Sequence, residues 1–340
     1  MEFHQNRNPN IKFDYYDLRV ERWYYKKGII VKKEKLEGDK EGYVSINLKE
    51  NSEFHKKENM NYYGADYDMD EIRKYHNDID NTYVISKSIL KSDVLINLPK
   101  LKTHKLAGVT LNMKNLVGTA VIKNSLPHHT LGSPKNKGDK FPVEKKKNII
   151  ETKLKNIALK LLKRKNPLIN YPFILIKNIM SKIFGNNNQI IRNGAWYGND
   201  TIWRTVVDLN KILLYSDEEG NMKDKRQRKY FGLIDGIRGG ENFGPMKPDP
   251  VNSGVLLAGF NPVIIDVVAA TIMGFDYKKI PHLNNAFNSK GYNITDYQPE
   301  EIKIKSNIDN WEKNINDFKL TDTLQFEPYF GWKGHIELDN

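Results

Sequence analysis

The sequence of 340 residues predicts an α/β fold in which a mostly parallel sheet is flanked by helices. Two apolar stretches, 230–234 and 253–259, lack the alternation of a half-exposed strand, which indicates burial on both faces. A helical apolar repeat follows, opened by Asn261 and Pro262 and ended by Gly274. Buried strands next to helices are typical of a parallel sheet with helices on both sides.

The first part of the chain has a different character from this α/β pattern. Residues 1–65 are polar, and short alternating stretches at 28–32 and 42–48 predict small strands, so we expect a small β-rich N-terminal extension. Residues 84–90 fit a helix that leads into a buried strand at 94–98.

An α/β core domain is expected over residues 66–132 and 195–305, with a C-terminal tail at 306–340. Between the two parts of the core, residues 133–194 predict a basic helical insertion. Its apolar side chains recur every three or four positions with lysines between them, namely at Ile150, Leu154, Ile157 and Leu161.

The net charge of +12 comes from one segment. Residues 133–184 hold fourteen Lys or Arg against three acidic residues, a surplus of eleven, so the other 288 residues carry about +1. The stretch 149–184 therefore predicts either a contact with an anionic membrane surface or a solvated flap. Nucleic acid is not expected as a partner, because aromatic residues are not interleaved with these lysines.

The composition excludes several classes of protein. No apolar run is long enough for a membrane-spanning helix, and the first residues lack a signal-peptide pattern. The chain has no cysteine, so it can ligate no iron–sulfur cluster through thiolates and has no thiol nucleophile. We expect a cytoplasmic protein, peripheral to a membrane if the basic segment binds lipid.

A cluster of cations, amides and one histidine follows the strand at 94–98. Ligands bind at the carboxyl ends of strands in open α/β sheets, so this segment predicts a site for a small anionic molecule. Its candidate binding and catalytic residues are Lys100, Lys102, His104, Asn112, Lys114 and Asn115.

His104 and Lys114 are the strongest candidates for catalysis. His104 titrates near neutral pH and can act as a general acid or base; alternatively it caps the strand. Partial burial of Lys114 would lower its pKa and make it a nucleophile or a phosphate contact. In the alternative, its stem packs and its ammonium group reaches water.

Asp235 and Glu241 flank a glycine-rich turn at a strand end, where a carboxylate can orient a histidine or bind a cation. Gly239 and Gly240 in that turn are candidate ligand contacts, or serve the backbone alone. The turn matches no phosphate-loop pattern.

A helix beginning after residue 199 adds further candidates. Asn199 and Arg204 are candidate binding residues, and the guanidinium of Arg204 can hold a carboxylate or phosphate. Asp200 is the expected N-cap of this helix, which should end near Ser216.

The adjacent pair His128 and His129 is a candidate source of one metal ligand and one supporting donor. Two neighbouring histidines are too few for a metal site, and no Glu or His at helical spacing completes one, so a zinc hydrolase is poorly supported.

Several motifs together resemble the domain-of-unknown-function 362 family (DUF362). They lie at 98–104, 108–118, 198–210, 235–245 and 261–270, and the resemblance covers about 80–132 and 195–290. Many relatives carry ferredoxin-like iron–sulfur modules, which a chain without cysteine cannot hold.

His104, Gly108 and Lys114, followed by His128 or His129, are more distantly similar to the catalytic domain of lactate racemase-type enzymes. This resemblance implies a proton-carrying His104, a Lys114 linked covalently to a nickel-pincer nucleotide cofactor, and His128 as a nickel ligand. The residues between His104 and Lys114 depart from that pattern.

The leading hypothesis is an enzyme that performs acid/base chemistry, such as isomerisation or racemisation, on a small anionic substrate. One alternative is a non-catalytic protein that binds anions or a membrane surface. Another is a partner of an iron–sulfur redox system whose centre lies in a different subunit.

Overall fold

The computed structural model describes residues 2–26, 29–65, 69–143 and 193–339, together with Lys145, Ile150 and Ile191. Most of the expected basic insertion at 133–194, and nearly all of the stretch 149–184, lies outside these residues. Among the described helices, none is long and apolar enough to cross a membrane.

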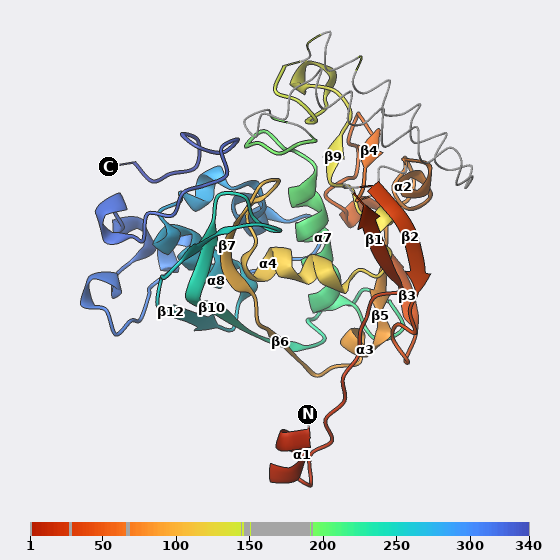
Figure 1. Cartoon of the computed structure of the whole chain (residues 1–340), viewed down its shortest axis with the longest axis horizontal. Coiled ribbons are helices and arrows are strands. Elements are labelled where there is room, and N and C mark those ends of the chain that lie inside the picture. The colour runs from red at the N-terminus through yellow and green to blue at the C-terminus, as the bar shows by residue number, and fades with distance from the viewer. Residues whose placement is uncertain are drawn as a thin grey trace.

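The central sheet is organised around one long strand, β10 (Lys229–Glu241) (Figure 1). On one side it pairs in parallel with β6 and β7, and on the other it pairs antiparallel with β11 and β12. The partners are β6 (Val94–Asn97), β7 (Lys100–His104), β11 (Asp249–Val251) and β12 (Val255–Gly259), and β8 (Gly108–Val109) extends the sheet beyond β7. The α/β class is confirmed, with parallel pairing at the centre of the sheet and antiparallel pairing at its margins.

The described helices cover only one face of this sheet. Helices α4 (Leu111–Asn115) and α8 (Pro262–Met273) pack on β10, and the side chains on that face are buried. On the opposite face Ile96, Ile237 and Leu256 are 59, 61 and 59% exposed. The expected burial of the strands on both faces is therefore wrong.

The sequence of β10 does not show that one face of the sheet is buried and the other exposed. Gly232 occupies an inward position of β10, and a Cβ atom there would lie 2.6 Å from Oδ1 of Asn112. The outward neighbours Phe231 and Leu233 are apolar. Because the outward residues are apolar and one inward residue is only a glycine, the two faces of the strand do not differ in polarity. The sequence therefore does not reveal that they differ in burial.

The N-terminal part forms small antiparallel pairs. The expected strand at 42–48 is confirmed as β3 (Tyr43–Asn47). Of the helix expected at 84–90, residues 87–90 are helical and form α3, whereas residues 84–86 belong to β5, which pairs with β3. The buried β-branched residues Val84 and Ile85 favour this pairing. The other elements here are α1 (Glu2–Arg7), β1 (Glu21–Lys26), β2 (Ile29–Lys35), β4 (Tyr62–Tyr63), α2 (Met69–Tyr75), β5 (Thr82–Ser86), α3 (Lys87–Leu90) and β9 (His129–Thr130).

Helix α7 (Ile202–Tyr215) crosses the molecule between the N-terminal strands and α4 (Figure 1). It ends before Ser216 as expected, but Asp200 is not its N-cap. The side chain of Asn199 accepts hydrogen bonds from the amides of Thr201 and Ile202, both at 3.0 Å. The remaining elements are α9 (Pro281–Asn284) and short 3₁₀ helices at Lys49–Asn51, Leu116–Thr119, Lys123–Ser125, Pro134–Asn136, Tyr277–Lys279, Asn285–Asn288, Pro299–Glu301, Asp309–Trp311, Ile315–Asp317 and Leu320–Asp322.

A buried ionic network joins α7 to the N-terminal part. Lys211, fully buried, donates to Glu53 at 2.6 Å and to Asp208 at 3.3 Å. The hydroxyls of Ser52 and Tyr83 donate to the other oxygen of Asp208. Each buried charge thus has a partner, which is what burial of an ion requires.

The C-terminal segment packs on the core over its described residues, 306–339. Trp332 is fully buried, and its indole N–H donates to the carbonyl oxygen of Lys105 at 2.9 Å. The six-membered part of its ring lies 3.3 Å from where a Cβ atom of Gly108 would be. This segment therefore braces the loop that follows β7.

Helix α8 begins and ends as its sequence predicts. Asn261 accepts from the amides of Val263 and Ile264, and Gly274 ends the helix in the left-handed conformation with φ 97°. Inside this helix Asp266 accepts hydrogen bonds from the amides of Asn112 and Met113, both at 2.7 Å. The carboxylate therefore holds the start of α4 against α8.

We expect Asp266→Asn to destabilise the protein by about 1–3 kcal/mol. Each oxygen of the carboxyl group has a lone pair for one of the two N–H groups even when the group is protonated, whereas the NH₂ of an amide cannot accept a hydrogen bond. Burial raises the pKa of Asp266 to about 7. A carboxyl group whose pKa is higher in the folded state contributes stability that is complete below its unfolded pKa and is lost as the pH rises toward 7. The difference in free energy of unfolding between the wild type and Asp266→Asn should therefore shrink between pH 5 and pH 8.

Urea denaturation at the two pH values measures this difference. Asp276→Asn is the matched control, because Asp276 accepts one amide hydrogen bond at the partly exposed start of a 3₁₀ helix. A loss that is equal at both pH values would contradict the assignment of a raised pKa to Asp266.

Candidate functional site

The candidate site is built on α4, whose first residue has an unusual backbone. Leu111 is fully buried and has φ 47°, in the left-handed region that costs a leucine about 1–2 kcal/mol. The two hydrogen bonds to Asp266 follow at the next two residues. The fold therefore holds α4 in a position that its local sequence disfavours.

Asn112 and Asn115, predicted as ligand contacts, belong to an amide network that fixes α4 to the sheet. Asn97 donates to the carbonyl oxygen of Asn112 and to the hydroxyl of Tyr230, both at 2.9 Å. Tyr230 donates to Oδ1 of Asn112 at 3.0 Å, and Asn115 donates to Oδ1 of Asn97 at 2.7 Å. Nδ2 of Asn112 is buried and makes no hydrogen bond to a described residue.

Lys114 projects from α4 without a counter-ion. It is partly buried and makes no hydrogen bond or ion pair with a described residue. Burial, and secondly the charge of Lys102, lower the pKa of Lys114 to about 8. Lys102 also makes no ion pair with a described residue, and burial lowers its pKa. The site therefore contains positive charge that the described protein does not neutralise.

His104 is buried at the end of β7, where its ring serves the loop that follows. Nδ1 accepts hydrogen bonds from the amides of Leu106 at 3.1 Å and Ala107 at 3.2 Å. These bonds place the proton of the neutral ring on Nε2. Burial first, and then the charge of Lys114, hold the pKa of His104 well below its usual value.

His128 has the opposite tautomer. Its Nδ1–H donates to the carbonyl oxygen of Leu126 at 2.7 Å, which leaves the lone pair on Nε2. Burial and then Lys114 lower the pKa of His128 to about 4. Asn199, a predicted binding residue, donates to the carbonyl oxygen of His128 at 3.1 Å and so positions the histidine rather than a ligand.

A third histidine, His282, was not predicted from the sequence. It is fully buried on α9, which packs on α7 and α8. Neither ring nitrogen has a hydrogen-bond partner among the described residues, and burial, then Lys114, lower its pKa to about 3. It is a lone histidine after Pro281, outside every recognisable motif, so its sequence gives no signal of a site.

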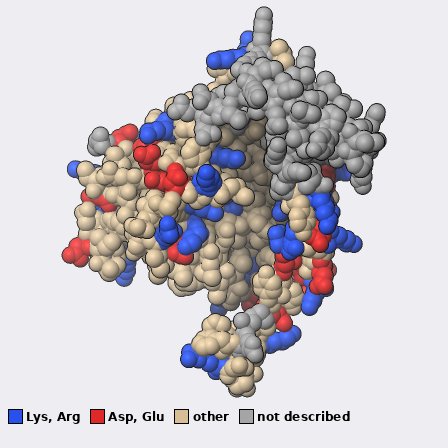
Figure 2. Space-filling view, viewed as in Figure 1, with Lys and Arg blue, Asp and Glu red and all other residues tan. Residues whose placement is uncertain are grey.

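Four titratable groups thus lie close enough for their charges to interact, namely Lys114, His104, His128 and His282. No carboxylate of the described chain is among the charges that shift their pKa values. Figure 2 shows basic side chains near the middle of the molecular face, in the region of β7 and α4. An anion would be attracted to such a cluster, which could also give and accept protons.

Other predicted site residues lie apart from this cluster. Lys100 and Asp235 form an ion pair of 2.6 Å on the open face of the sheet, with side chains 53 and 43% exposed. This pairing lowers the pKa of Asp235. Glu241 accepts the amide of Glu327 at 2.8 Å and so holds the C-terminal segment.

The predicted turn at Gly239 and Gly240 is wrong, because both residues continue β10. A Cβ atom at Gly239 would lie 2.8 Å from Phe326, and one at Gly240 would lie 2.7 Å from Pro248. The glycines therefore permit close packing and keep the strand extended through 235–241.

Arg204 and His129 also serve the fold. Arg204 donates to both oxygens of Asp200 at 3.0 Å and to the carbonyl oxygen of Glu53. The ring of His129 stacks on Tyr63, with centroids 5.0 Å apart. No group of three or more metal-binding side chains occurs within the described ranges.

The comparisons with known proteins add one match. A model of a family described as "Domain of unknown function (DUF362)" matches residues 40–271, which is 232 of the 340 residues. The match starts within the expected N-terminal extension and is wider than the motifs alone suggest. No curated protein and no solved structure matches the chain. The chain therefore belongs to the DUF362 family.

Proposed function

We propose that the cluster around Lys114 binds a small anionic molecule and moves a proton on it. The observation that carries this proposal is a partly buried lysine whose charge lowers the pKa values of two buried histidines, His104 and His282, and of the partly buried His128, with no carboxylate of the described chain among the charges that shift these pKa values. Burial of a cation without a partner is unfavourable, and a bound carboxylate or phosphate would supply the missing charge.

Unsatisfied polar groups near α4 support the same proposal. Oγ1 of Thr110, Nδ2 of Asn112 and both ring nitrogens of His282 are buried without a hydrogen-bond partner in the described chain. Buried polar atoms are normally paired, and those left without a partner are often reserved for a ligand or water. A small molecule with both charge and hydrogen-bonding atoms fits these groups.

The tautomers favour a division of roles between two histidines. His104 offers an Nε2–H donor, because its Nδ1 lone pair is engaged by two amides. His128 offers an Nε2 lone pair and is the better base. In this mechanism Lys114 holds the anion, whose charge raises the low pKa of His128. His128 then removes a proton beside the carboxylate, and His104 donates a hydrogen bond to the charge that develops.

Return of the proton to the opposite face of the same carbon would give racemisation, and return to a neighbouring atom of the substrate would give isomerisation. A non-catalytic anion-binding protein would use Lys114 in the same way but would not need the lone pair of His128. The alternative of membrane binding through 149–184 concerns a stretch of which the structure describes only Ile150. The alternative of a partner for an iron–sulfur system concerns a redox centre in a different subunit.

The resemblance to lactate racemase-type enzymes adds a specific proposal about a cofactor. Lys114 would carry the nickel-pincer nucleotide and His128 would be the metal ligand. The low pKa of Lys114 suits an amine that reacts as a nucleophile, and Nε2 of His128 has the lone pair that a metal requires. Such a group supplies an electron-pair acceptor when bound; the chain's own residues still orient the substrate and hold its proton.

Replacing Lys114 by methionine should weaken anion binding by about 10–100-fold, the loss expected for one charged hydrogen bond of about 1.5–3 kcal/mol. The same change should raise the free energy of unfolding at pH 7 by about 1–3 kcal/mol, because it removes an uncompensated charge. Calorimetric titration with phosphate and with pyruvate tests binding, and Lys123→Met is the control at a lysine outside the cluster.

The titration also tests the protonation of Lys114. The pKa of about 8 means that part of the amine is neutral at about pH 8–9, and binding of an anion should restore its proton. The measured enthalpy should then depend on the ionisation enthalpy of the buffer. Binding without proton uptake, and equal in Lys114→Met, would rule out Lys114 as the anion contact.

Proton transfer should appear as exchange with solvent. In D₂O the protein should replace the hydrogen on the carbon beside the carboxylate in at least one member of a panel of short 2-hydroxy and 2-amino acids, and proton NMR would follow this exchange. His128→Gln should abolish this exchange, and His104→Gln should slow it by about 10²-fold. His55→Gln is the control. Exchange that survives His128→Gln would assign the base elsewhere, and binding without exchange would favour the non-catalytic alternative.

Mass spectrometry tests the tethered cofactor directly. Protein purified from its native host should have an added mass that persists after denaturation and maps to Lys114, together with nickel by elemental analysis. An unmodified mass without nickel would eliminate this branch and leave acid/base chemistry by the chain's own residues.

A further inference from the structure

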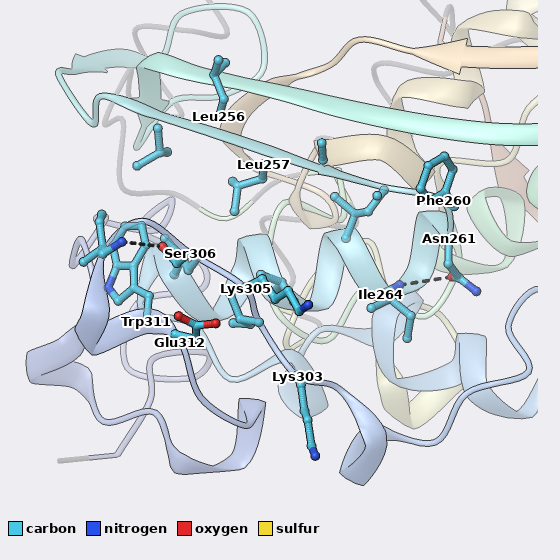
Figure 3. Close-up of a pocket in the computed structure, with 18 of the residues that line it drawn as sticks. Leu256, Leu257, Phe260, Asn261, Ile264, Lys303, Lys305, Ser306, Trp311 and Glu312 are labelled. Atoms are coloured by element: carbon cyan, nitrogen blue, oxygen red, sulfur yellow. Dashed lines mark hydrogen bonds between the residues drawn. The ribbon is translucent and has the colours of Figure 1, made fainter.

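A groove lies between β12, α8 and the segment 303–308 (Figure 3). It has a volume of about 970 Å³. Leu257 of β12 and Ile264 and Val268 of α8 give it an apolar lining, and these side chains are only partly buried. Segment 303–308 forms the opposite wall.

Both walls of the groove present unpaired backbone. β12 pairs with β10 along one edge, and no described strand pairs with its other edge. In the opposite wall Ile302 and Ile304 bond to residues 313–315, whereas the backbone groups of Lys303 and Lys305 make no hydrogen bond to a described residue. An added strand could therefore form hydrogen bonds with both walls.

The edge of β12 is unprotected. Proteins usually blunt an edge strand with proline or a charge, as β11 does with Asp249 and Pro250. β12 has the sequence Val-Leu-Leu-Ala-Gly, which contains neither. An apolar free edge next to an apolar groove is typical of a strand that is covered by another chain.

The N-terminal arm, residues 2–19, has the properties of the missing strand. Ile11, Phe13 and Tyr15 alternate with polar residues, which is the pattern of a strand, but the structure contains no strand there. Among the described residues, every hydrogen bond of the arm stays within the arm. Tyr15 is 77% exposed and Ile11 is 53% exposed. In Figure 1 the arm carries α1 away from the rest of the molecule.

We propose that residues 11–18 of a second copy of this chain enter the groove as a strand beside β12, and that two copies exchange arms in this way. The exchange buries Ile11, Phe13 and Tyr15 against α8 and completes the edge of the sheet. It is independent of the chemistry proposed for Lys114.

The groove and the inserted segment carry small net charges of opposite sign. The lining holds Arg226, Lys303 and Lys305 against Asp296 and Glu312, whereas residues 11–18 hold Asp14 and Asp17 against Lys12. These aspartates pair locally with Lys12 at 3.0 Å and Arg19 at 2.6 Å, in exposed positions. Exposed pairs contribute little stability, so their exchange for contacts in the groove requires little free energy.

Light scattering after size exclusion tests the assembly. The full chain should have about twice its mass of 39.5 kDa at high concentration. Deletion of residues 2–19 should give a monomer, and so should Asp14→Pro, because proline removes an N–H from the inserted strand. Asn10→Pro, outside 11–18, is the matched control and should remain dimeric. A full-length chain that is monomeric at every concentration, or a dimer that survives deletion of the arm, would overturn the proposal.

The absence of cysteine from the chain makes cross-linking specific. Tyr15→Cys and Ser306→Cys proteins, purified separately and mixed, should form a mixed covalent dimer with a short bis-maleimide. The double variant tests the alternative occupant, which is the chain's own arm. A link only within one chain would reject exchange between copies, and failure of the mixed proteins to link would reject the groove as the binding site of the arm.

Discussion

The carboxylate of Asp266 is the contact on which the candidate site depends. It reaches from the middle of α8 to the first amides of α4 and holds a short helix that starts at a left-handed leucine. Five residues cannot form a stable helix by themselves, so α4 exists because α8 and the amide network hold it. The direction of Lys114, and with it the charge of the cluster, follows from that one contact.

Two lysines with buried or partly buried side chains differ in their partners: Lys211 has acidic partners, whereas Lys114 has none among the described residues. Lys211 pairs with Glu53 and Asp208, and its hydrogen bonds join α7 to the segment 51–53. Lys114 has no such partner in the described residues. The first arrangement is typical of a structural ion pair, whereas the second retains a charge at the expense of stability. Proteins tolerate such a loss mainly at sites where a ligand completes the interaction.

The sequence predicted those features that depend on residues close to one another in the chain. The caps of α8, the end of α7 and the cluster of cations after β6 could all be predicted from short motifs. The helix at 84–90 was predicted correctly only over 87–90, because pairing with β3 makes residues 84–86 a strand. At the start of α7 the capping side chain is Asn199 instead of Asp200, because capping depends on side-chain direction, which spacing does not determine.

Other features were missed because they depend on packing between distant segments. The open face of the sheet was not predicted, because β10 has apolar residues on its outward face and a glycine on its inward face, so apolar and polar residues do not alternate there. His282 gave no signal because it reaches the cluster only through the packing of α9 on α7 and α8.

The position of Trp332 has a consequence for how the protein is made. Its indole bonds to the carbonyl oxygen of Lys105 and its ring covers Gly108, in the loop that fixes the tautomer of His104. The tryptophan and the lysine are separated by 227 positions in the sequence. During translation the loop therefore emerges long before the residue that secures it, and a nascent chain has an unfinished site until Trp332 has left the ribosome.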